Sequence, residues 1–211
     1  MTIIKSLTTA AFAGAALLGV ASAATVDVST TADVVTVGDT FEVRLNFSAD
    51  DSAEFLFDAI AEFEFDGALF DFVSADFTDP ATGLNQLSLP DDPDAIGEGI
   101  FEVAQLSDNL LDITAVSDNS FAFLQDEQAD DFTLVTLTFS AEEVGTGDLG
   151  LGAFFDFLFA NDPDFANADF FSADVLDAFV TVEVAPIPLP GAAVFLLTGA
   201  AGLFARRRVA A

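Results

Sequence analysis

Apolar and polar residues alternate along most of the chain between residues 24 and 184. The segment 40–48, TFEVRLNFS, alternates four apolar side chains with polar ones, and the segment 61–67, AEFEFDG, repeats the alternation before an Asp-Gly pair. Successive residues of a strand point to opposite faces, so a period of two predicts strands with one buried face. The Asp-Gly pair is typical of the turn that ends such a strand.

Five further segments are interpreted as strands: 70–77, 100–106, 110–117, 132–140 and 178–184. In the fourth of them the apolar parity slips between Leu134 and Val135, which predicts a β-bulge or burial of both faces. No window between the strands shows a long helical period. Many short strands joined by turns rich in Asp, Gly, Asn and Ser predict an all-β fold, an antiparallel β-sandwich formed as one domain by residues 24–184.

Acidic residues dominate the same region. All 36 Asp and Glu lie between Asp27 and Glu183, where Arg44 is the only basic residue, and the whole chain has a formal net charge of −31. Repulsion excludes nucleic acid and anionic lipid as partners. Dissolved ions screen such charge, so we interpret it as adaptation to salty water. Arg44 is expected to pair with an Asp or Glu across the sheet, in preference to clamping a ligand.

The chain contains no Cys and no His. Catalytic triads that need either residue and the usual nitrogen and sulfur ligands of zinc are therefore excluded. A glycosidase with two carboxylates stays open as an alternative, because many pairs of acids are present. The expectation is a protein that is not an enzyme and has no cofactor, with calcium as an open candidate.

The N-terminus has the pattern of a secretory signal peptide. Lys5 precedes an apolar run over residues 10–20, and Ala21-Ser22-Ala23 is a small-residue cleavage motif. This pattern predicts a signal peptide over residues 1–23, a mature chain that begins at Ala24, and export of the protein.

The C-terminus, residues 185–211, contains a short apolar segment at 191–205 followed by Arg206, Arg207 and Arg208. As a helix the segment would extend about 22 Å, against about 30 Å of hydrocarbon in a bilayer, so it is a marginal transmembrane helix. Basic residues beside an apolar segment mark the cytoplasmic side. The segment is either a permanent anchor or a sorting signal that is removed.

The proline-rich motif before the apolar segment favours a sorting signal over a permanent anchor. The residues Pro186, Ile187, Pro188, Leu189, Pro190 and Gly191, with the helix and the arginines, resemble the PEP-CTERM class of sorting signals, in its VPLPA variant. The resemblance implies an exosortase-like processing enzyme as a partner. It also implies a transient stay in the inner membrane of a Gram-negative bacterium, followed by release to the cell surface or extracellular matrix.

The strand sequences carry a second resemblance. Val37-Gly38-Asp39-Thr40-Phe41, then Phe65-Asp66-Gly67-Ala68-Leu69, then Leu134-Val135-Thr136-Leu137-Thr138-Phe139 resemble successive motifs of the cohesin-like family. The resemblance implies a jelly-roll β-sandwich of nine strands, an architecture also found in carbohydrate-binding modules. The chain departs from the family pattern at Gly67, where proline is usual, and in a Phe-rich stretch over residues 153–171 that we interpret as an insertion.

Two acidic loops are candidate calcium sites, because carboxylates on short loops supply hard oxygen ligands. The candidate ligands are Asp91, Asp92 and Asp94 in one loop and Asp162 and Asp164, beside Asn161, in the other. Neither loop has EF-hand spacing, because apolar residues stand where oxygen ligands are required. Each loop has a proline after an Asp, so ordinary solvated turns are the favoured interpretation.

Seven phenylalanines crowd residues 153–171, either as core or as an exposed patch that binds a protein or a polymer. The absence of Trp and Tyr leaves sugar binding without its usual aromatic platforms. The sequence therefore favours a non-catalytic surface or matrix protein that is adhesive or scaffolding in the envelope or biofilm, with an unknown surface protein or polysaccharide as partner. The first alternative is a polysaccharide-binding module, and the second, less favoured one is a glycosidase with two carboxylates.

Overall fold

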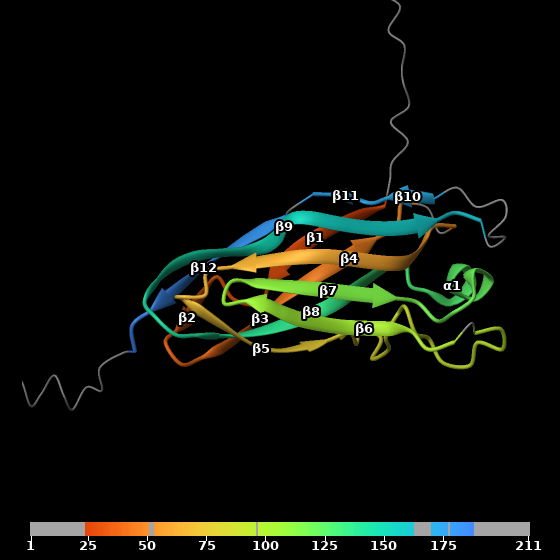
Figure 1. Ribbon diagram of the computed structural model, residues 1–211. Coiled ribbons are helices and arrows are strands. Elements are labelled where there is room, and N and C mark those ends of the chain that lie inside the picture. The colour runs from red at the N-terminus through yellow and green to blue at the C-terminus, as the bar shows by residue number, and fades with distance from the viewer. Residues whose placement is uncertain (1–23, 51–52, 96, 163–169, 177, 188–211) are drawn as a thin grey trace, which may run out of the picture.

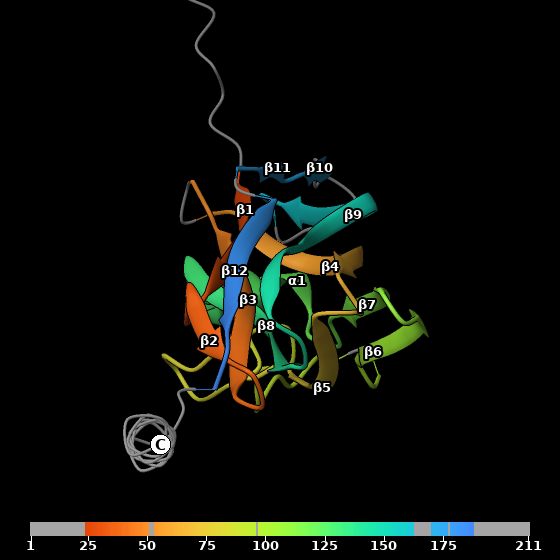
Figure 2. The same ribbon diagram turned by 90° about the vertical axis from the view of Figure 1, so that its left-hand side faces the viewer.

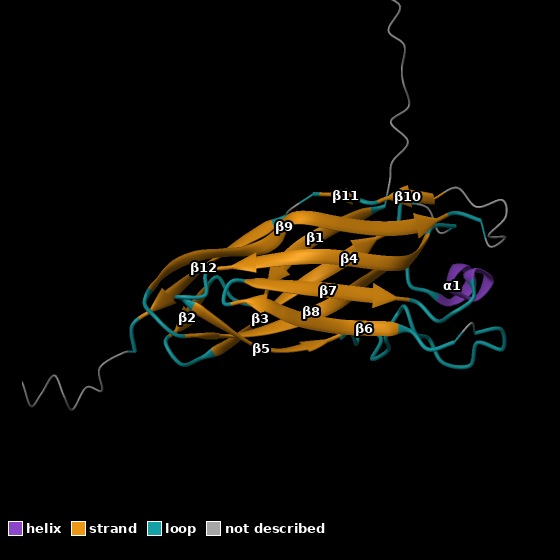
Figure 3. Cartoon of the chain, in the orientation of Figure 1, coloured by secondary structure: helices purple, strands orange, loops and turns teal. Residues whose placement is uncertain are grey.

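The computed structural model describes residues 24–50, 53–95, 97–162, 170–176 and 178–187. Twelve strands and one short helix form in these residues, and the helix is the purple element at one end of Figure 3. In chain order the elements are β1 (Thr25–Thr30), β2 (Val34–Thr36), β3 (Thr40–Ser48), β4 (Phe55–Phe65), β5 (Phe70–Asp76), β6 (Ile100–Ser107), β7 (Leu110–Val116), α1 (Phe121–Glu127), β8 (Asp131–Ala141), β9 (Gly145–Ala160), β10 (Phe170–Ser172), β11 (Asp174–Val175) and β12 (Phe179–Ala185).

The strands form two sheets packed face to face, which confirms the predicted all-β sandwich. Sheet A has five strands in the order β11-β1-β3-β8-β5. Sheet B has seven, in the order β2-β12-β9-β4-β7-β6, with β10 paired to β9. Figure 1 looks onto the outer face of sheet B, with sheet A behind it, and Figure 2 shows the two layers from the side.

Most strand pairs are antiparallel, as predicted, but two pairs are parallel. β1 pairs with β11, and β2 pairs with β12. The chain leaves sheet A after β1 and enters sheet B as β2. Each of its first two strands therefore lies beside one of its last two, with one such pair in each sheet. Strand pairing thus holds the beginning of the described chain to its end.

The strands predicted from the period of two are present. In β3 the four apolar residues of TFEVRLNFS are buried and the polar ones are more exposed, as expected. The parity slip in β8 is a bulge: Leu45 pairs with Val135, Asn46 pairs with Thr133, and Leu134 is the extra residue between them. Residues 132–135 are all buried, so the bulge and burial of both faces occur together.

The interpretation of residues 153–171 as an insertion is wrong for residues 153–160. These residues are the second half of β9, which pairs with β4 on one side and, at residues 158–160, with β10 on the other. The strand was hard to recognise because its first half, GTGDLGLG, alternates glycine with other residues and has few side chains that reveal a period. A bulge then places Ala61 opposite Phe155 but Phe63 opposite Leu151.

At two positions of the cohesin-like motifs, backbone conformation or close packing explains why the residue is glycine. Gly38 has a φ of +90°, which favours glycine, and its N–H donates to the carbonyl of Ala141 at the turn before β3. Gly67 replaces the usual proline of the family motif, and a Cβ at this position would collide with the carbonyl of Asp108. The turn after β4 therefore packs directly against the turn between β6 and β7.

Aromatic rings from both sheets fill the core. Phe139 of β8 is fully buried, and its ring centroid lies 5.1 to 6.1 Å from those of four other phenylalanines: Phe41, Phe63, Phe65 and Phe72. A smaller cluster closes the end of the sandwich beside α1, where Leu124 packs with Phe55 and Ala160. Size and aromatic packing thus give this cysteine-free domain its core.

Candidate binding surface

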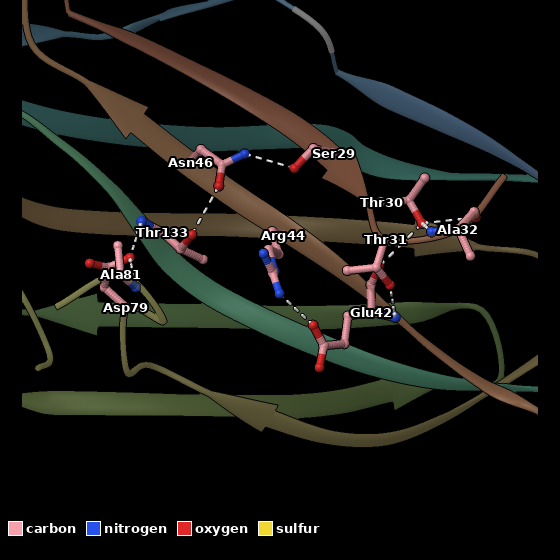
Figure 4. A network of polar contacts seen from close by, with 10 residues as sticks. All are labelled: Ser29, Thr30, Thr31, Ala32, Glu42, Arg44, Asn46, Asp79, Ala81 and Thr133. Carbon is pink, nitrogen blue, oxygen red and sulfur yellow. Dashed lines mark hydrogen bonds and ion pairs between the residues drawn. The ribbon is translucent and has the colours of Figure 1, made fainter. Parts of the chain in front are cut away.

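The two outer faces of the sandwich differ in how many hydrogen bonds their polar side chains form with one another. On sheet A, Asn46 of β3 donates to Asp27 at 3.0 Å and to Ser29 at 2.8 Å, and it accepts from the hydroxyl of Thr133 at 3.1 Å. Figure 4 shows this network running from β1 across β3 to β8 and on to Asp79. These four side chains are thus engaged with one another, whereas Nε of Arg44 on the same face is buried without a hydrogen-bond partner among the described residues.

Asp79 extends the network beyond the end of β5. This side chain is 1% exposed, and its carboxylate accepts from the N–H of Thr133 at 3.2 Å, the N–H of Thr82 at 3.1 Å and the hydroxyl of Thr82 at 2.9 Å. β5 pairs with β8 only as far as Thr136, so the carboxylate covers the edge of β8 that β5 leaves open. Burial disfavours the charged form, but these hydrogen bonds outweigh it and lower the pKa of Asp79 below 3.8.

Arg44 also lies on this face, but its partner differs from the expected one. Its guanidinium forms an ion pair at 2.7 Å with Glu42, two residues earlier on the same strand, and not with an acid across the sheet. Residues i and i+2 of a strand share a face, so an acid on the same strand reaches the guanidinium. Both side chains are partly exposed, so the pair contributes little to stability.

The outer face of sheet B alternates carboxylates with apolar side chains. Its rows follow from the strand register across β4, β7 and β6. They are Asp58, Val116 and Ile100, then Ile60, Thr114 and Glu102, then Glu62, Asp112 and Ala104. β9 adds Leu158 beside Asp58 and Asp156 beside Ile60. The intervening residues of β4 and β7 are buried in the core, so these residues point outward.

Several large apolar side chains of sheet B are exposed. Phe154 of β9 and Phe179 of β12 are each 54% exposed, and Ile100 and Leu106 of β6 are 49% and 58% exposed. On the strands of sheet A only Val73 reaches a similar value among the described residues, at 54%. Exposed apolar groups of this size on one face are typical of an interaction surface.

A hollow of about 390 Å³ lies at the end of this face, where β4 turns. Its lining consists of Glu64, Phe65, Asp66, Asn109, Asp148 and Phe179. Phe179 packs beside Gly150, where a Cβ would come within 2.6 Å of the ring. We call this feature the Phe179 hollow.

Two carboxylates meet on the outer face of sheet B near α1. Asp58 is half-buried, its Oδ1 is buried without a hydrogen-bond partner among the described residues, and the nearby charge of Asp156 opposes its own. Burial, which is the larger cause, and repulsion by Asp156 together raise the pKa of Asp58 above 3.8. The native protein therefore bears a cost when Asp58 is ionised.

We expect Asp58→Asn to stabilise the protein at neutral pH, raising its melting temperature by about 1 to 3 °C. The cost is absent below the unfolded pKa of 3.8, where Asp58 is protonated in both states, and complete above the higher folded pKa. The gain should therefore disappear as the pH falls below 3.8. Thermal melts between pH 3 and 7 measure this. Asp71→Asn, which removes one exposed charge on β5, is the control, and an equal gain for both variants would contradict the burial argument.

The loop of the first calcium candidates is tied to the chain itself. Both carboxylate oxygens of Asp92 accept hydrogen bonds, from Asp94 N at 2.9 Å and from Ser120 N at 2.6 Å. Burial acts to raise the pKa of Asp92, and these hydrogen bonds, together with those from the Ser120 and Asn119 side chains, outweigh it and lower the pKa below 3.8. Asp92 thereby attaches this loop to the start of α1, while Asp91, with a φ of +71°, and Asp94 are exposed.

The loop of the second calcium candidates is only partly described, because the range 97–162 ends within it. Asn161 and Asp162 follow β9, and Asp164 lies outside the described residues. Within the described ranges, no group of three His, Cys, Asp or Glu is placed to hold a metal ion.

Calcium binding by these loops stays a prediction that a melting experiment can test. If the acidic charge is only an adaptation to salt, the melting temperature should rise smoothly with any monovalent salt. A structural site would add a saturable rise at millimolar or lower calcium while the salt concentration stays high and constant. Asp92→Asn and Asp162→Asn would then identify the loop, because only the variant that lacks the ligand loses the rise.

The phenylalanines of residues 153–171 divide between the two interpretations. Phe157 and Phe159 are buried in the core, whereas Phe154 and Phe155 are exposed. Phe165 and the side chains of Phe170 and Phe171 lie outside the described part of the structure. Phe154 belongs to residues 152–154, which the bulge opposite Glu62 takes out of the regular register, and Phe155 follows that bulge directly.

Both ends of the chain bear on localisation. The predicted signal peptide over residues 1–23 lies outside the described residues, as do positions 188–211 with most of the proline motif and all three arginines. Pro186 and Ile187 are described, and both are exposed just after β12. Among the described residues, no helix is long and apolar enough to cross a membrane.

Comparison with known proteins places the fold. No family model matches the chain, and no curated protein matches it in sequence. Among solved structures, the seventh ScaB type I cohesin from Pseudobacteroides cellulosolvens is similar with a TM-score of 0.54 and 13% identity, over 80% of this chain and 96% of that one.

Two further cohesins were solved with a partner. The sixth cohesin of scaffoldin B from Acetivibrio cellulolyticus, in complex with a Cel5 dockerin, has a TM-score of 0.52 and 10% identity over 78% of this chain and 100% of that one. The cohesin of the Coh-OlpC–Doc435 complex from Clostridium thermocellum has a TM-score of 0.51 and 14% identity, over 79% of this chain and 96% of that one. The chain therefore has a cohesin-like β-sandwich fold, as predicted.

Proposed function

We propose that this protein is a non-catalytic, exported module that binds another protein at the bacterial surface through the outer face of sheet B. The observation that carries the proposal is the contrast between the two faces. On sheet A the Asn46 network joins polar side chains of β1, β3 and β8, whereas sheet B presents exposed Phe154, Ile100 and Leu106 among carboxylates. Two of the similar structures are complexes of a cohesin with a dockerin, which supports a protein partner for this sandwich.

Within this proposal the protein is an adhesive or scaffolding component of the envelope or biofilm matrix. Two copies of so acidic a chain repel each other, so contacts between copies need apolar groups or bridging cations. The first test compares Phe154→Ser with Val73→Ser in cells, because both side chains are 54% exposed but lie on different sheets. Phe154→Ser should reduce cell aggregation and surface attachment toward the level of a gene deletion, at defined calcium, and Val73→Ser should leave both unchanged.

Polysaccharide binding is the second candidate, because exposed Phe154 and Phe179 lie on a sheet face with polar neighbours. The purified protein is therefore screened against polysaccharides in parallel. Unchanged attachment of the deletion strain, with tight binding to one glycan, would make the protein a carbohydrate-binding module. Hydrolysis of that glycan, lost when one carboxylate is replaced, would make it an enzyme.

We further propose that a signal peptidase and an exosortase-like enzyme process the chain. The support is the small-residue motif before Ala24 and the proline motif before an apolar segment that, as a helix, would be short for a permanent anchor. The mature protein recovered from cells should begin at Ala24 and lack Arg206, Arg207 and Arg208, and its mass measures both events. Replacing Pro188 and Pro190 with alanine should trap it at the inner membrane. Recovery of a mature chain that ends at Ala211 would instead indicate a plain anchor.

A further inference from the structure

The Phe179 hollow combines negative charge with an aromatic wall. Three of its lining residues are acidic: Glu64 at the end of β4, Asp66 in the turn that follows, and Asp148 of β9. The ring of Phe179, on β12, is 54% exposed and packs over Gly150. The register joins these parts, because Gly150 is the partner of both Phe179 and Glu64.

The charge of the hollow is not neutralised within the described protein. Arg44, the only basic residue of the described ranges, lies on sheet A and is paired with Glu42. Asp66 accepts a hydrogen bond from Ala68 N at 3.0 Å, and Asp148 accepts one from the Thr181 hydroxyl at 2.6 Å. Neither contact supplies a positive charge. For the side-chain carboxylate of Glu64 the described residues offer no hydrogen bond or ion pair.

Two glycines keep this part of the face accessible. A Cβ at Gly152 would approach Cγ of Glu64 to 3.2 Å, and one at Gly150 would collide with the carbonyl of Ala178 and press on Phe179. The missing side chains leave Glu64 uncovered and let the Phe179 ring lie low against the sheet. Elsewhere on the face, like charges also oppose each other directly, as Glu62 does Asp112.

Building on the proposed function, we propose that the partner is a protein that inserts a lysine or arginine side chain into the Phe179 hollow, with apolar residues beside it. A cationic side chain matches the hollow in two ways, since its charged end meets the carboxylates and its stem or guanidinium plane packs on the ring. An apolar wall suits such a side chain better than it suits a divalent cation, which takes oxygen ligands all round. Exposed Phe154 and Leu106 then meet the apolar neighbours of the inserted side chain.

The test uses short peptides as probes on the mature protein recovered from cells. The probe is acetyl-Gly-Leu-Lys-Leu-Gly-amide, and the reference is the same peptide with glutamine in place of lysine. Binding is followed by backbone NMR shifts at low and at high salt. A carbodiimide then couples the lysine amine to any carboxylate in contact with it, and mass spectrometry locates the linked residue.

Matched variants separate the hollow from the general acidity of the protein. Glu64→Gln with Asp148→Asn removes two charges in the hollow, and Asp71→Asn with Asp131→Asn removes two exposed charges on sheet A. The third variant, Phe179→Ala, removes the ring and keeps every charge. Circular dichroism and melting curves test whether each variant is folded.

The expected result is saturable binding of the lysine peptide, with linkage to Glu64, Asp66 or Asp148. The hollow double variant and Phe179→Ala should each weaken it about tenfold, and the sheet A double variant should leave it within about twofold. Equal weakening by both double variants, linkage spread over both faces, or no preference for lysine over glutamine would overturn the proposal. The Phe154→Ser attachment assay tests the proposed function separately, so a failure of the inference about the hollow is distinguished from a failure of the proposed function.

Discussion

Phe139→Ala is expected to lower the free energy of unfolding by about 3 to 5 kcal/mol, the largest effect of any single substitution considered. The ring is fully buried in β8 and contacts rings from β3, β4 and β5, so truncation leaves a cavity where the two sheets meet. The surrounding rings come from paired strands and cannot collapse into the space without disturbing the register. Denaturant unfolding at constant high salt measures the loss.

Two further variants control this experiment. Phe139→Leu keeps most of the volume and should cost clearly less than alanine, because the cavity is smaller. Phe154→Ala removes a ring that is 54% exposed and should change stability by no more than about 0.5 kcal/mol. A loss below 1 kcal/mol for Phe139→Ala would show that the ring cluster does not hold the two sheets together.

Asp79→Ala should have the second largest effect, a loss of about 2 to 3 kcal/mol at neutral pH. The substitution removes the acceptor for the N–H of Thr133 and for the N–H and hydroxyl of Thr82, and it leaves the Thr133 N–H buried without a partner. Asp76→Asn, at the end of β5 just before this loop, is the control, since the Asp76 carboxylate accepts from Thr78 N in an exposed position. Its effect should stay within about 0.5 kcal/mol.

The pH dependence provides a second check on Asp79. Its pKa is lowered in the folded protein, so the ionised form contributes stability that is present above the unfolded value of 3.8. That contribution is lost as the pH falls through the lower folded pKa. The difference between the native protein and Asp79→Ala should therefore shrink in acid. A difference that stays constant down to pH 2 would mean that the ionised carboxylate is not what stabilises the loop.

Strands with one regular, half-buried face could be predicted from the sequence, and the others could not. β3 alternates strictly because its inner face lies in the core and its outer face carries the polar network, so pattern and structure agree residue by residue. β2 has three residues and β11 has two, too few to establish a period, whereas β1 alternates over six residues and yet is not among the predicted strands. β9 hides its period behind glycines and a bulge.

Only some features of the candidate surface could likewise be predicted from the sequence. The excess of carboxylates and the solitary arginine are visible in the sequence, and so are the exposed-or-buried alternatives for Phe154 and Phe157. Which of these phenylalanines faces solvent depends on the bulge opposite Glu62, a property of the pairing between β9 and β4. The partner of Arg44 likewise depended on which acid lay within reach.

By itself the sequence determined the all-β class, the bulge in β8 and the lack of basic groups in the folded region, because alternation and composition are local properties of the chain. Only the tertiary structure decided which residues meet. It brought Glu64, Asp148 and Phe179 together from β4, β9 and β12, which are distant along the chain. It also placed Asp79 over the open edge of β8 and Asp58 near Asp156. The reason is that strand order and register in a sandwich depend on packing between both sheets, which no local pattern encodes.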